Sequence, residues 1–468
     1  MATICIANIE AQNSIVANAY LTSTGIQDVI IKSYNYPYTI TCAFCDFSDP
    51  QSYYSIIALN DANHVSHQRP LTGYRVHDFV IDHDTVFFCG ESQYGFGVIG
   101  FLDINDFFYN WGDFYIQDTI RLIDGNSVAN LTDMVTYYGE DGFKHVVSIG
   151  YAQDSFIYYT SQNSCIVDMK FENYNMYSYN TGVISKSNPE ALKDIELRGN
   201  YIVTAGFELG PYISIRLYNK NNIFYSGGIQ NTVYVFNIPT GQDTQIWETD
   251  DLSIALDGDF DFAIASVFNR YTSPTPNYQR RTQSVHLSKF NKSYLLTNNP
   301  NAMTIASQLY AIDDHAVGVD SVFQFVNNWR NGNYGLLFNM TYKDMHSRTF
   351  FFELSNRFIT CFNHMVAYTG DDFCYDRGYT GLDMYNFSTQ YVIGGRCAED
   401  HWEQQFCVET PLNASTCNPK VEYYLNAVPR MEYSTVRIDI EDYGGIGGPT
   451  RHNTLSMHNK EINIICEE

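Results

Sequence analysis

The sequence predicts an all-β protein built from a repeated unit of short strands. Three observations support this prediction. Few windows place apolar residues at helical spacing, apolar runs of strand length lie between turn-forming residues, and one pattern recurs along the chain. Aromatic side chains, which pack well on pleated sheets, make up 16% of the 468 residues, with 38 Tyr and 31 Phe.

Turn-forming pairs separate the apolar runs. Examples are Gly199-Asn200, Thr240-Gly241, Asp257-Gly258 and Asn331-Gly332. Gly and Asn tolerate the backbone angles of tight turns, so such pairs between apolar runs indicate hairpins. The sequence therefore predicts antiparallel strands that follow one another along the chain.

The clearest repeat joins the segments that begin at Val76 and at Leu192. Aligned without a gap at an offset of 116 residues, they match at Asp78 and Asp194, Gly90 and Gly206, Ile99 and Ile215, Asn105 and Asn221, and Tyr109 and Tyr225. Divergent copies lie between and after them. Their anchor positions, 55 to 61 residues apart, are Ile81, Thr136, Leu197, Leu256, Ile312 and Tyr368, and a last copy begins at Ser434.

A recurring period of this length indicates a solenoid, a propeller or an array. Each copy contains strand, turn, strand and a looser pair of strands, which is the composition of a propeller blade. We therefore predict a single β-propeller of about seven four-stranded blades, with six or eight as alternatives. Tandem β-sandwiches or a β-helix are the competing architectures.

Strands from both ends of the chain are expected to close the propeller. The N-terminal stretches 38–42 and 53–57 would supply strands to the closing blade, and closure by N- and C-terminal strands would seal the open sheet edge. There are 13 Pro and no Ser/Gly-rich tract or block of like charges that would mark a linker. Residues 1–468 are thus predicted to form one domain, with a Cys-rich, loop-rich part from about residue 361.

The charge balance excludes some partners. The chain has 27 Lys+Arg against 52 Asp+Glu, a formal net charge of −25. Nucleic-acid binding relies on Lys and Arg to neutralise phosphates, so we expect no nucleic-acid partner. The same balance disfavours an anionic membrane surface. No run approaches the 18 or more apolar residues of a membrane helix, so we predict no membrane span.

The cysteines and the chain start bear on the compartment. Six of the 11 Cys fall in the last quarter, and the candidates for disulfides are Cys361, Cys374, Cys397, Cys407 and Cys417. Buried free thiols are the alternative. The first residues lack the basic and apolar regions of a signal peptide. Either the chain is cytosolic, or it is a mature exported chain whose signal peptide has been removed.

Scarce Lys and plentiful Asn, Tyr, Ser and Thr favour export, and the expected location is secreted, periplasmic or at the cell surface. The run 86–90 followed by 97–101 resembles uncharacterised secreted β-propeller proteins of Bacteroidetes-type gut bacteria, over about residues 20–360. This resemblance implies an exported, surface-associated protein and transfers no catalytic residue. The signatures of WD40, kelch and sialidase-type blades are absent from the sequence.

Two short motifs resemble ligand-binding loops. Gly95, Gly97 and Gly100 match the spacing of a dinucleotide loop, but a strand pattern follows where a helix is needed, so we predict a hairpin. Asp257, Asp259 and Asp261 alternate like the start of a calcium loop, without its later Gly and Glu. This excludes an EF-hand, and we predict a turn with solvated carboxylates and no cofactor, with an incidental calcium site as the alternative.

Acidic residues flank histidines at three places: 82–84, 313–315 and 399–403. In a propeller, loops from separate blades converge at one end of the channel, where two acids could form the pair that hydrolyses a glycosidic bond. In a chain this acidic, each cluster alone is better explained as a solvated turn.

Aromatic residues on loops are the candidates for ligand binding. Tyr and Trp stack on sugar faces and anchor protein interfaces at low entropic cost. The candidates are Trp329, Trp402, Tyr177 and Tyr179, which lie in or beside polar stretches. Most of the other aromatic residues are expected in the core.

Three functions are compatible with the sequence. The favoured one is a secreted or cell-surface, non-enzymatic binding module that recognises a glycan or a protein through loops rich in aromatic residues, Asn and Asp. In that case we expect the carboxylates not to converge. The alternatives are a carbohydrate-active hydrolase or lyase with paired carboxylates at the channel mouth, and a structural scaffold of a surface assembly.

Overall fold

The computed structural model describes the strands and most turns between residues 15 and 455. Several shorter loops lie outside the described residues, together with the longer stretches 1–14, 18–24, 106–114, 153–162, 238–245, 272–279, 294–302, 369–375, 410–435, 444–450 and 456–468.

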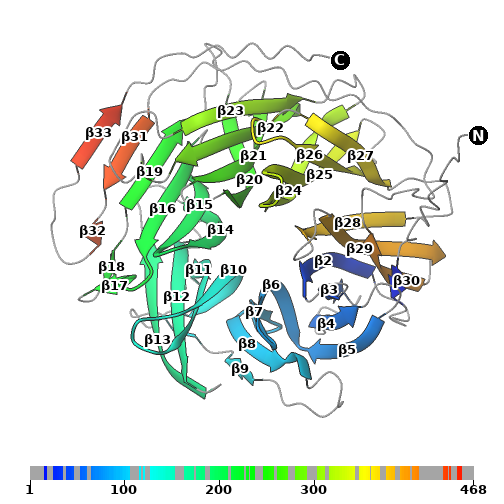
Figure 1. Ribbon diagram of the computed structural model, residues 1–468, viewed down its shortest axis with the longest axis horizontal. Helices are drawn as coiled ribbons and strands as arrows, with labels where there is room; N and C mark the ends of the chain where they lie inside the picture. The colour runs from blue at the N-terminus through cyan, green and yellow to red at the C-terminus, as the bar shows by residue number, and fades with distance from the viewer. Residues whose placement is uncertain are drawn as a thin grey trace, which may run out of the picture.

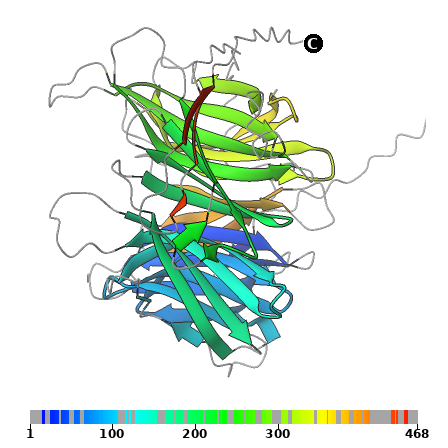
Figure 2. The same cartoon turned by 90° about the vertical axis from the view of Figure 1, so that its left-hand side faces the viewer.

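Antiparallel sheets of short strands are arranged around a common centre (Figure 1). In the described part of the chain, seven sheets have four or more strands and an eighth has three. Seen from the side, the sheets form the wall of a ring (Figure 2). The prediction of an all-β chain of repeated, small antiparallel sheets is therefore confirmed.

The first four sheets follow one another along the chain. Their strands are β2 (Gly25–Ser33), β3 (Thr39–Asp46), β4 (Tyr53–Asn60) and β5 (Val65–Thr72); β6 (Tyr74–Asp82), β7 (Thr85–Ser92), β8 (Gly97–Asp103) and β9 (Tyr115–Gln117); β10 (Val128–Tyr138), β11 (Lys144–Ala152), β12 (Asn163–Glu172) and β13 (Asn175–Ile184); β14 (Glu190–Arg198), β15 (Tyr201–Glu208), β16 (Tyr212–Asn219) and β19 (Thr232–Asn237).

Three further sheets complete the series. Their strands are β20 (Ile246–Asp257), β21 (Asp261–Tyr271), β22 (Arg280–Asn291) and β23 (Met303–Tyr310); β24 (Ala316–Asn328), β25 (Asn333–Tyr342), β26 (Ser347–Leu354) and β27 (Thr360–Tyr368); β28 (Asp376–Met384), β29 (Tyr391–Asp400), β30 (Glu403–Glu409) and β1 (Ile15–Ala17). β31 (Val436–Ile440) and β33 (Arg451–Leu455) extend the fourth sheet beyond β19, and the three-stranded sheet contains β17 (Phe224–Tyr225), β18 (Gly228–Gln230) and β32 (Asp442–Tyr443).

The first strand of each sheet faces the centre of the ring (Figure 1). These inner strands, β2, β6, β10, β14, β20, β24 and β28, pack against one another in chain order, and β28 packs against β2. Apolar clusters fill the space between neighbouring sheets: Phe88 of β7 packs in one cluster with Ile57 of β4, and Phe87 in another with Val146 of β11. Alternation along a strand thus sends side chains into the cores on either side of it.

Each inner strand carries a β-bulge at the same place. The pairing with the second strand shifts just before Asp28, Asp78, Asp133, Asp194, Asp251, Gln324 and Gly381. A bulge leaves backbone groups unpaired within the sheet and increases its local twist. The Asp78–Asp194 match of the sequence repeat thus marks a bulge position.

Glycine lies opposite several bulges. Gly90, Gly150 and Gly206 are paired with the residue that precedes the bulge, and a Cβ at any of them would collide with the backbone carbonyl of Arg75, Asn130 or Ala191. Only glycine leaves room for that carbonyl. The Gly90–Gly206 match of the sequence repeat therefore has a steric cause.

Two expectations about the ends of the chain are wrong. Stretches 38–42 and 53–57 belong to β3 and β4 of the first sheet, and it is β1 that pairs with β30 in the last one. The segment from Ser434, expected as a last repeat, supplies β31, which pairs with β19 of the fourth sheet. The period could not reveal these pairings because each short strand binds an edge that is distant in sequence.

The anchor positions are correct for four sheets and then drift. Ile81, Thr136, Leu197 and Leu256 lie on inner strands, whereas Tyr368 lies on the fourth strand β27 and Ile312 is outside the described residues. The bulge-to-bulge distance from Asp251 to Gln324 is longer than that of the earlier repeats. The fifth sheet has longer strands and connections, so a fixed period misplaces the strands of the later sheets.

We expect Gly206→Ala to lower the free energy of unfolding by about 3 kcal/mol, because the new methyl group must displace the bulged backbone at Ala191. Gly95→Ala is the control, since Gly95 has a positive φ of 73° and open space around it, so its cost is about 1 to 2 kcal/mol. Urea unfolding of both variants measures the difference, and equal costs would contradict the steric explanation.

Candidate functional site

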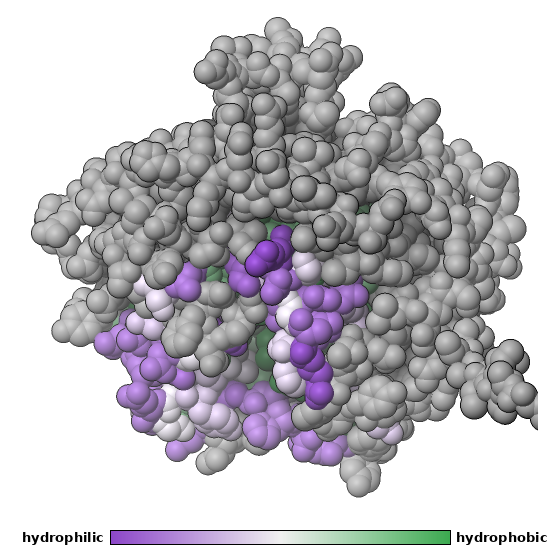
Figure 3. Space-filling view, turned by 45° about the horizontal axis from the view of Figure 1, so that its top comes forward, coloured by the Kyte–Doolittle hydropathy of each residue, from purple (hydrophilic) through white to green (hydrophobic). Residues whose placement is uncertain are grey.

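The inner strands enclose a cavity of about 690 Å³. All seven contribute to its lining, through residues at and just after their bulges. On the face shown in Figure 3, the described surface is mostly hydrophilic, and hydrophobic surface is visible only within hollows. The cavity is therefore the place where the repeat brings equivalent side chains from different sheets together.

Carboxylates from five sheets line this cavity, together with Lys32: Asp78, Asp133, Asp194, Glu196, Asp251 and Asp383. Lys32 Nζ lies 3.4 Å from Asp78 Oδ1. The expectation that carboxylates do not converge is therefore wrong, because the bulge positions of successive sheets face one centre.

Several of these side chains have a structural task. Asp133 Oδ2 accepts a hydrogen bond from the Ile195 amide at 2.8 Å, and Asp194 Oδ2 accepts one from the Ile254 amide at 2.7 Å. Asp383 Oδ2 accepts from the Ser33 amide at 2.6 Å. Each carboxylate thus binds a backbone amide of an inner strand in the next sheet of the ring, and each inner strand is the edge strand of its sheet.

Neutral serine hydroxyls accept the same kind of hydrogen bond from inner strands of other sheets. Ser55 Oγ accepts from the Val76 amide at 3.1 Å, and Ser164 Oγ accepts from the Leu192 amide at 3.1 Å. Ser253 Oγ accepts from Phe325 at 3.2 Å. A carboxylate is therefore not required for this contact between sheets.

Burial and mutual repulsion raise the pKa values of the cavity acids. Burial raises the pKa of Asp133 well above its usual value, and the charges of Asp78 and Asp194 raise it further. Burial and the charge of Asp194 raise the pKa of Glu196 to about 8. Burial also raises the pKa values of Asp194 and Asp383. Some of these groups hold a proton at neutral pH, because the cavity cannot stabilise all of their charges.

Lys32 is the opposite case. Burial alone would lower its pKa, but the charges of Asp78, Asp383, Asp133 and Glu196 outweigh burial and raise it. Lys32 therefore remains an ammonium group among the acids. Among the described residues, no group of three or more His, Cys, Asp or Glu side chains is placed to hold a metal ion.

One carboxylate oxygen of the cavity has no hydrogen-bond partner. Asp78 is 6% exposed, its Oδ1 faces Lys32, and its Oδ2 is buried without a partner. Asp78 differs in this from Asp133, Asp194 and Asp383, whose Oδ2 atoms bind backbone amides. A protonated Asp133 supplies a donor to the Asp78 carboxylate, since a side-chain hydrogen bond with Asp78 contributes to the raised pKa of Asp133.

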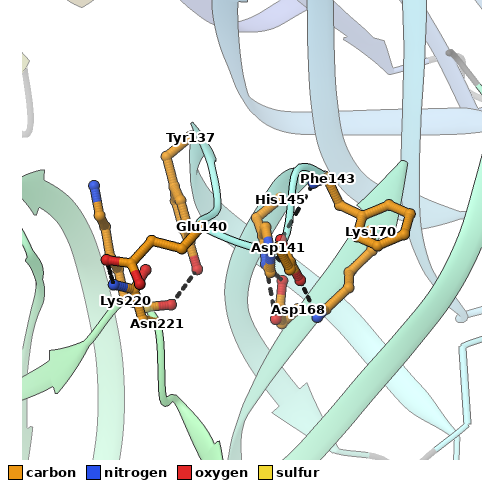
Figure 4. A network of polar contacts seen from close by, with 9 residues as sticks. All are labelled: Tyr137, Glu140, Asp141, Phe143, His145, Asp168, Lys170, Lys220 and Asn221. Carbon is orange, nitrogen blue, oxygen red and sulfur yellow. Dashed lines mark hydrogen bonds and ion pairs between the residues drawn. The ribbon is translucent and has the colours of Figure 1, made fainter. Parts of the chain in front are cut away.

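A second polar region lies at the end of each sheet where a turn connects the inner strand to the second strand. We call this end of a sheet its turn end. In the third sheet, His145 is held between two carboxylates, with Nδ1 2.9 Å from Asp168 Oδ1 and Nε2 3.1 Å from Asp141 Oδ1 (Figure 4). Lys170 Nζ donates to Asp141 Oδ2 at 2.6 Å, and the Tyr137 ring stacks on His145 at 4.8 Å. These contacts fix the β10–β11 turn against β12.

The same region joins neighbouring sheets. Tyr137 Oη donates to the Lys220 carbonyl at 2.7 Å, and Asn221 Nδ2 donates to Glu140 at 2.7 Å (Figure 4). Lys144 pairs with Asp82 of the second sheet, and Tyr34 Oη donates to Asp84 at 2.7 Å. The turn ends of the first four sheets therefore form one connected surface. The acid–His cluster predicted at 82–84 contributes to these contacts.

Exposed aromatic side chains gather at the turn ends. The large hydrophobic side chains that are exposed in the described residues are Tyr38, Tyr94, Tyr138, Tyr177 and Trp329. Four of them lie at a turn end, and Tyr94 lies at the other end of its sheet, between β7 and β8. Tyr177 stacks on Phe143 at 4.5 Å, and Lys144 Nζ lies 4.5 Å from the Tyr138 ring centroid.

The structure separates the four predicted ligand-binding residues. Tyr177 and Trp329 are 63% and 61% exposed, and the Arg330 guanidinium lies 4.6 Å from the Trp329 ring centroid. Tyr179 is half-buried and packs against the core between the second and third sheets. Trp402 lies outside the described residues. Tyr177 and Trp329 are on different sheets, the third and the sixth.

The other predicted site residues are placed only in part. Asp257 pairs with Asp261 across the β20–β21 hairpin, and Asp259 lies outside the described residues.

The candidate disulfide residues are also described only in part. Cys361, Cys397 and Cys407 lie on β27, β29 and β30, whereas Cys374 and Cys417 are outside the described part. The described free thiols, Cys42, Cys89 and Cys165, are buried. Burial raises the pKa values of Cys89 and Cys165, which makes them unreactive.

The predicted hairpin at Gly95, Gly97 and Gly100 is confirmed, because β8 runs antiparallel to β7.

Sequence reasoning did not single out the cavity acids, although the Asp78–Asp194 match was a signal for them. A position that repeats in every blade can be recognised as an inner-strand residue only when the strand order is known.

In the part that the structure describes, there is no helix of the length and apolar character needed to cross a bilayer.

No protein-family model and no curated protein matches the chain. Among solved structures, it is similar to the β-propeller domain of the Trilobed protease from Pyrococcus furiosus, at 8% identity and a TM-score of 0.38, over 85% of this chain and 99% of that one. It is also similar to the NanB sialidase from Streptococcus pneumoniae, at 7% identity and a TM-score of 0.40, over 84% and 70% of the chains.

A third similar structure is the GH93 α-L-arabinofuranosidase of Fusarium graminearum, at 10% identity and a TM-score of 0.37, over 85% of this chain and 98% of that one. Identities and TM-scores this low carry no argument about activity. The sheets themselves, arranged around one centre with their first strands innermost, define the class: the chain has a β-propeller fold.

We expect the His145 cluster to make stability depend on pH. Burial alone would lower the pKa of His145, but Asp168 and Asp141 outweigh burial and raise it above 6.5. The protonated His145 therefore stabilises the fold fully below about pH 6.5, and this stabilisation is lost as pH rises through the folded-state pKa.

Urea unfolding at about pH 6 and about pH 9 tests this expectation. The wild-type chain should lose more stability between the two pH values than His145→Gln, which cannot be protonated. Asp168→Asn should reduce the difference, because it removes one of the two carboxylates. Identical pH profiles for the wild type and His145→Gln would contradict the assignment.

Proposed function

We propose that this protein is a secreted or cell-surface, non-enzymatic binding module that recognises a glycan or a protein through aromatic side chains at the turn ends of its sheets. The observation that carries the proposal is the exposure of Tyr138, Tyr177 and Trp329 on that side, where polar and charged groups surround them. An exposed aromatic ring beside hydrogen-bonding groups is the usual platform for a sugar face or a protein anchor.

The finer architecture belongs to the same proposal. We infer seven blades, one for each sheet with an inner strand, and closure by the pairing of β1 with β30. A rigid closed ring would hold the turns of separate blades at fixed distances. The ligand would then meet a preorganised surface, which reduces the entropic cost of binding.

The inner-strand acids support a second candidate, a carbohydrate-active hydrolase. Glycoside hydrolysis needs a protonated acid beside an ionised carboxylate, and Glu196, with a pKa of about 8, lines the same cavity as Asp78. This candidate is weaker, because Asp133, Asp194 and Asp383 bind backbone amides and thereby serve the fold. The scaffold hypothesis has no specific observation in its favour.

A glycan-array screen with the full chain tests the binding module. For any glycan that binds, Tyr177→Ala and Trp329→Ala should each weaken binding about tenfold or more, because each removes a stacking surface. Tyr94→Ala is the matched control, since Tyr94 is even more exposed, at 74%, but lies at the opposite end of its sheet. Equal losses in all three variants, or none in the first two, would contradict the turn-end site.

Product detection on the same polysaccharides tests the hydrolase. Cleavage by the wild type that Glu196→Gln abolishes, with the fold intact by circular dichroism, would establish Glu196 as the acid and refute the non-enzymatic proposal. Binding without cleavage would exclude this candidate for the glycans tested.

A further inference from the structure

The turn end of the sixth sheet carries the exposed indole of Trp329 beside two exposed arginines. Trp329 and Arg330 belong to the β24–β25 turn, and Arg357 belongs to the β26–β27 turn. Both turns lie at the same end of the sheet, because β25 is antiparallel to both β24 and β26. The two hairpins are about 10 Å apart, which is two strand spacings.

Hydrogen bonds hold the β24–β25 turn in one shape. The Arg330 amide donates to Asn328 Oδ1 at 3.2 Å, and the Gly332 amide donates to the Asn328 carbonyl at 2.8 Å. Asn333 Nδ2 donates to Glu353 Oε1 at 2.8 Å, which joins this turn to β26. The turn therefore presents its exposed side chains in a fixed arrangement, and a ligand does not have to order them.

The β26–β27 turn is held by a buried aromatic ring. Phe358 has a positive φ of 62°, a backbone conformation that is unfavourable for a bulky residue. Burial of the Phe358 ring offsets this strain, since its centroid lies 5.3 Å from that of Tyr334 and 6.4 Å from that of Phe325. The core thus fixes this turn, and Arg357, which precedes Phe358, is exposed on it.

Arg357 differs from the cations at the turn end of the third sheet. There, Lys144 pairs with Asp82, and Lys170 pairs with Asp141. The hydrogen bond of Arg357 comes from its backbone amide, and its guanidinium has no ion pair with any residue that the structure describes. A guanidinium offers several N–H donors in a planar fork that matches a carboxylate. Arg357 is therefore available to an anionic ligand.

We propose that this turn end binds an acidic glycan, an oligosaccharide with uronic acid units, in which Trp329 stacks on a sugar ring and Arg357 binds a carboxylate. This inference rests on the proposed function and names the class of glycan. The Arg330 guanidinium, 4.6 Å from the Trp329 ring centroid, covers one face of the indole. With 61% of Trp329 exposed, the opposite face is left for a sugar ring.

The arrangement favours an acidic glycan over two other ligands. A neutral glycan would use the indole and leave the Arg357 guanidinium without a partner. An acidic peptide offers carboxylates, but it is flexible and must be ordered on two fixed turns at an entropic cost that a rigid sugar chain largely avoids. The net charge of −25 does not prevent the contact, because charges more than about 8 Å apart are largely screened at physiological salt.

Isothermal titration of the full chain tests the proposal with hexamers of galacturonate, mannuronate and glucuronate. The matched neutral probes are the hexamers of galactose, mannose and glucose, which have CH2OH in place of the carboxylate. We expect at least one uronate hexamer to bind about tenfold or more tightly than its neutral counterpart, because charge-assisted hydrogen bonds are the stronger ones. Added NaCl should weaken that binding.

The outcomes separate this inference from the proposed function. Neutral hexamers that bind as tightly as the uronates, with losses in Trp329→Ala, would overturn the inference and leave the binding module standing. Poly-L-glutamate that binds more tightly than every uronate hexamer would also overturn it, in favour of an acidic peptide. Absence of binding by all six hexamers would overturn it as well, and the glycan array then decides the proposed function.

Arg357→Gln should weaken uronate binding about tenfold or more and leave the affinity for neutral hexamers unchanged, whereas Trp329→Ala should weaken both. Arg121→Gln is the control with the same change in net charge, because Arg121 is exposed before the start of β10, at the end opposite to the turn end. Equal affinities of the wild type and Arg357→Gln would contradict the assignment, as would equal losses in Arg357→Gln and Arg121→Gln.

Arg357→Lys provides a second route if Arg357→Gln lowers the melting temperature. Lysine keeps the charge but lacks the planar fork, so this variant should bind uronate hexamers more weakly than the wild type and more tightly than Arg357→Gln. Equal affinities of Arg357→Lys and Arg357→Gln would show that the charge at this position does not contribute, and would contradict the proposal.

Discussion

A β-bulge in the inner strand of each sheet shapes the centre of the ring. The bulge interrupts pairing with the second strand at one place, and the inner strand is also the edge strand of its sheet, so some of its backbone amides have partners outside the sheet. Those partners are side chains of the preceding sheet, such as Asp133 for Ile195 and Ser164 for Leu192. Each sheet is therefore joined to the next by hydrogen bonds at its centre as well as by the apolar clusters between the sheets.

This solution places carboxylates at the centre of the ring. An Asp beside a bulge is well suited to accept from a neighbouring amide, but sheets around one centre bring their Asp residues together. The repulsion that results raises the pKa values of Asp133 and Glu196 and holds Lys32 as an ammonium group. Neutral hydroxyls perform the same structural task at Ser55, Ser164 and Ser253. The number of acids therefore exceeds what the contacts between sheets require.

The turn ends are organised by different forces. There the sheets are joined by ion pairs and hydrogen bonds of side chains, as around His145 and between Asn221 and Glu140 (Figure 4). Because these contacts hold the turns in place, aromatic rings such as Tyr177 can remain exposed without loss of order. The central cavity and the turn ends thus offer two chemically distinct surfaces. The cavity is charged and enclosed, and the surface at the turn ends is aromatic and open.

The fold class and the repeat could be predicted from the sequence. Apolar runs between turn pairs predicted the strands, and the matches of Asp78 with Asp194 and of Gly90 with Gly206 marked the bulge and the glycine opposite it, because both depend on local backbone geometry. The sequence could not show which strand edges β1 and β31 bind, or that the acids of separate sheets meet. The physical reason is that pairing at a sheet edge and repulsion among buried charges depend on distances between residues far apart in the chain, which periodicity does not encode.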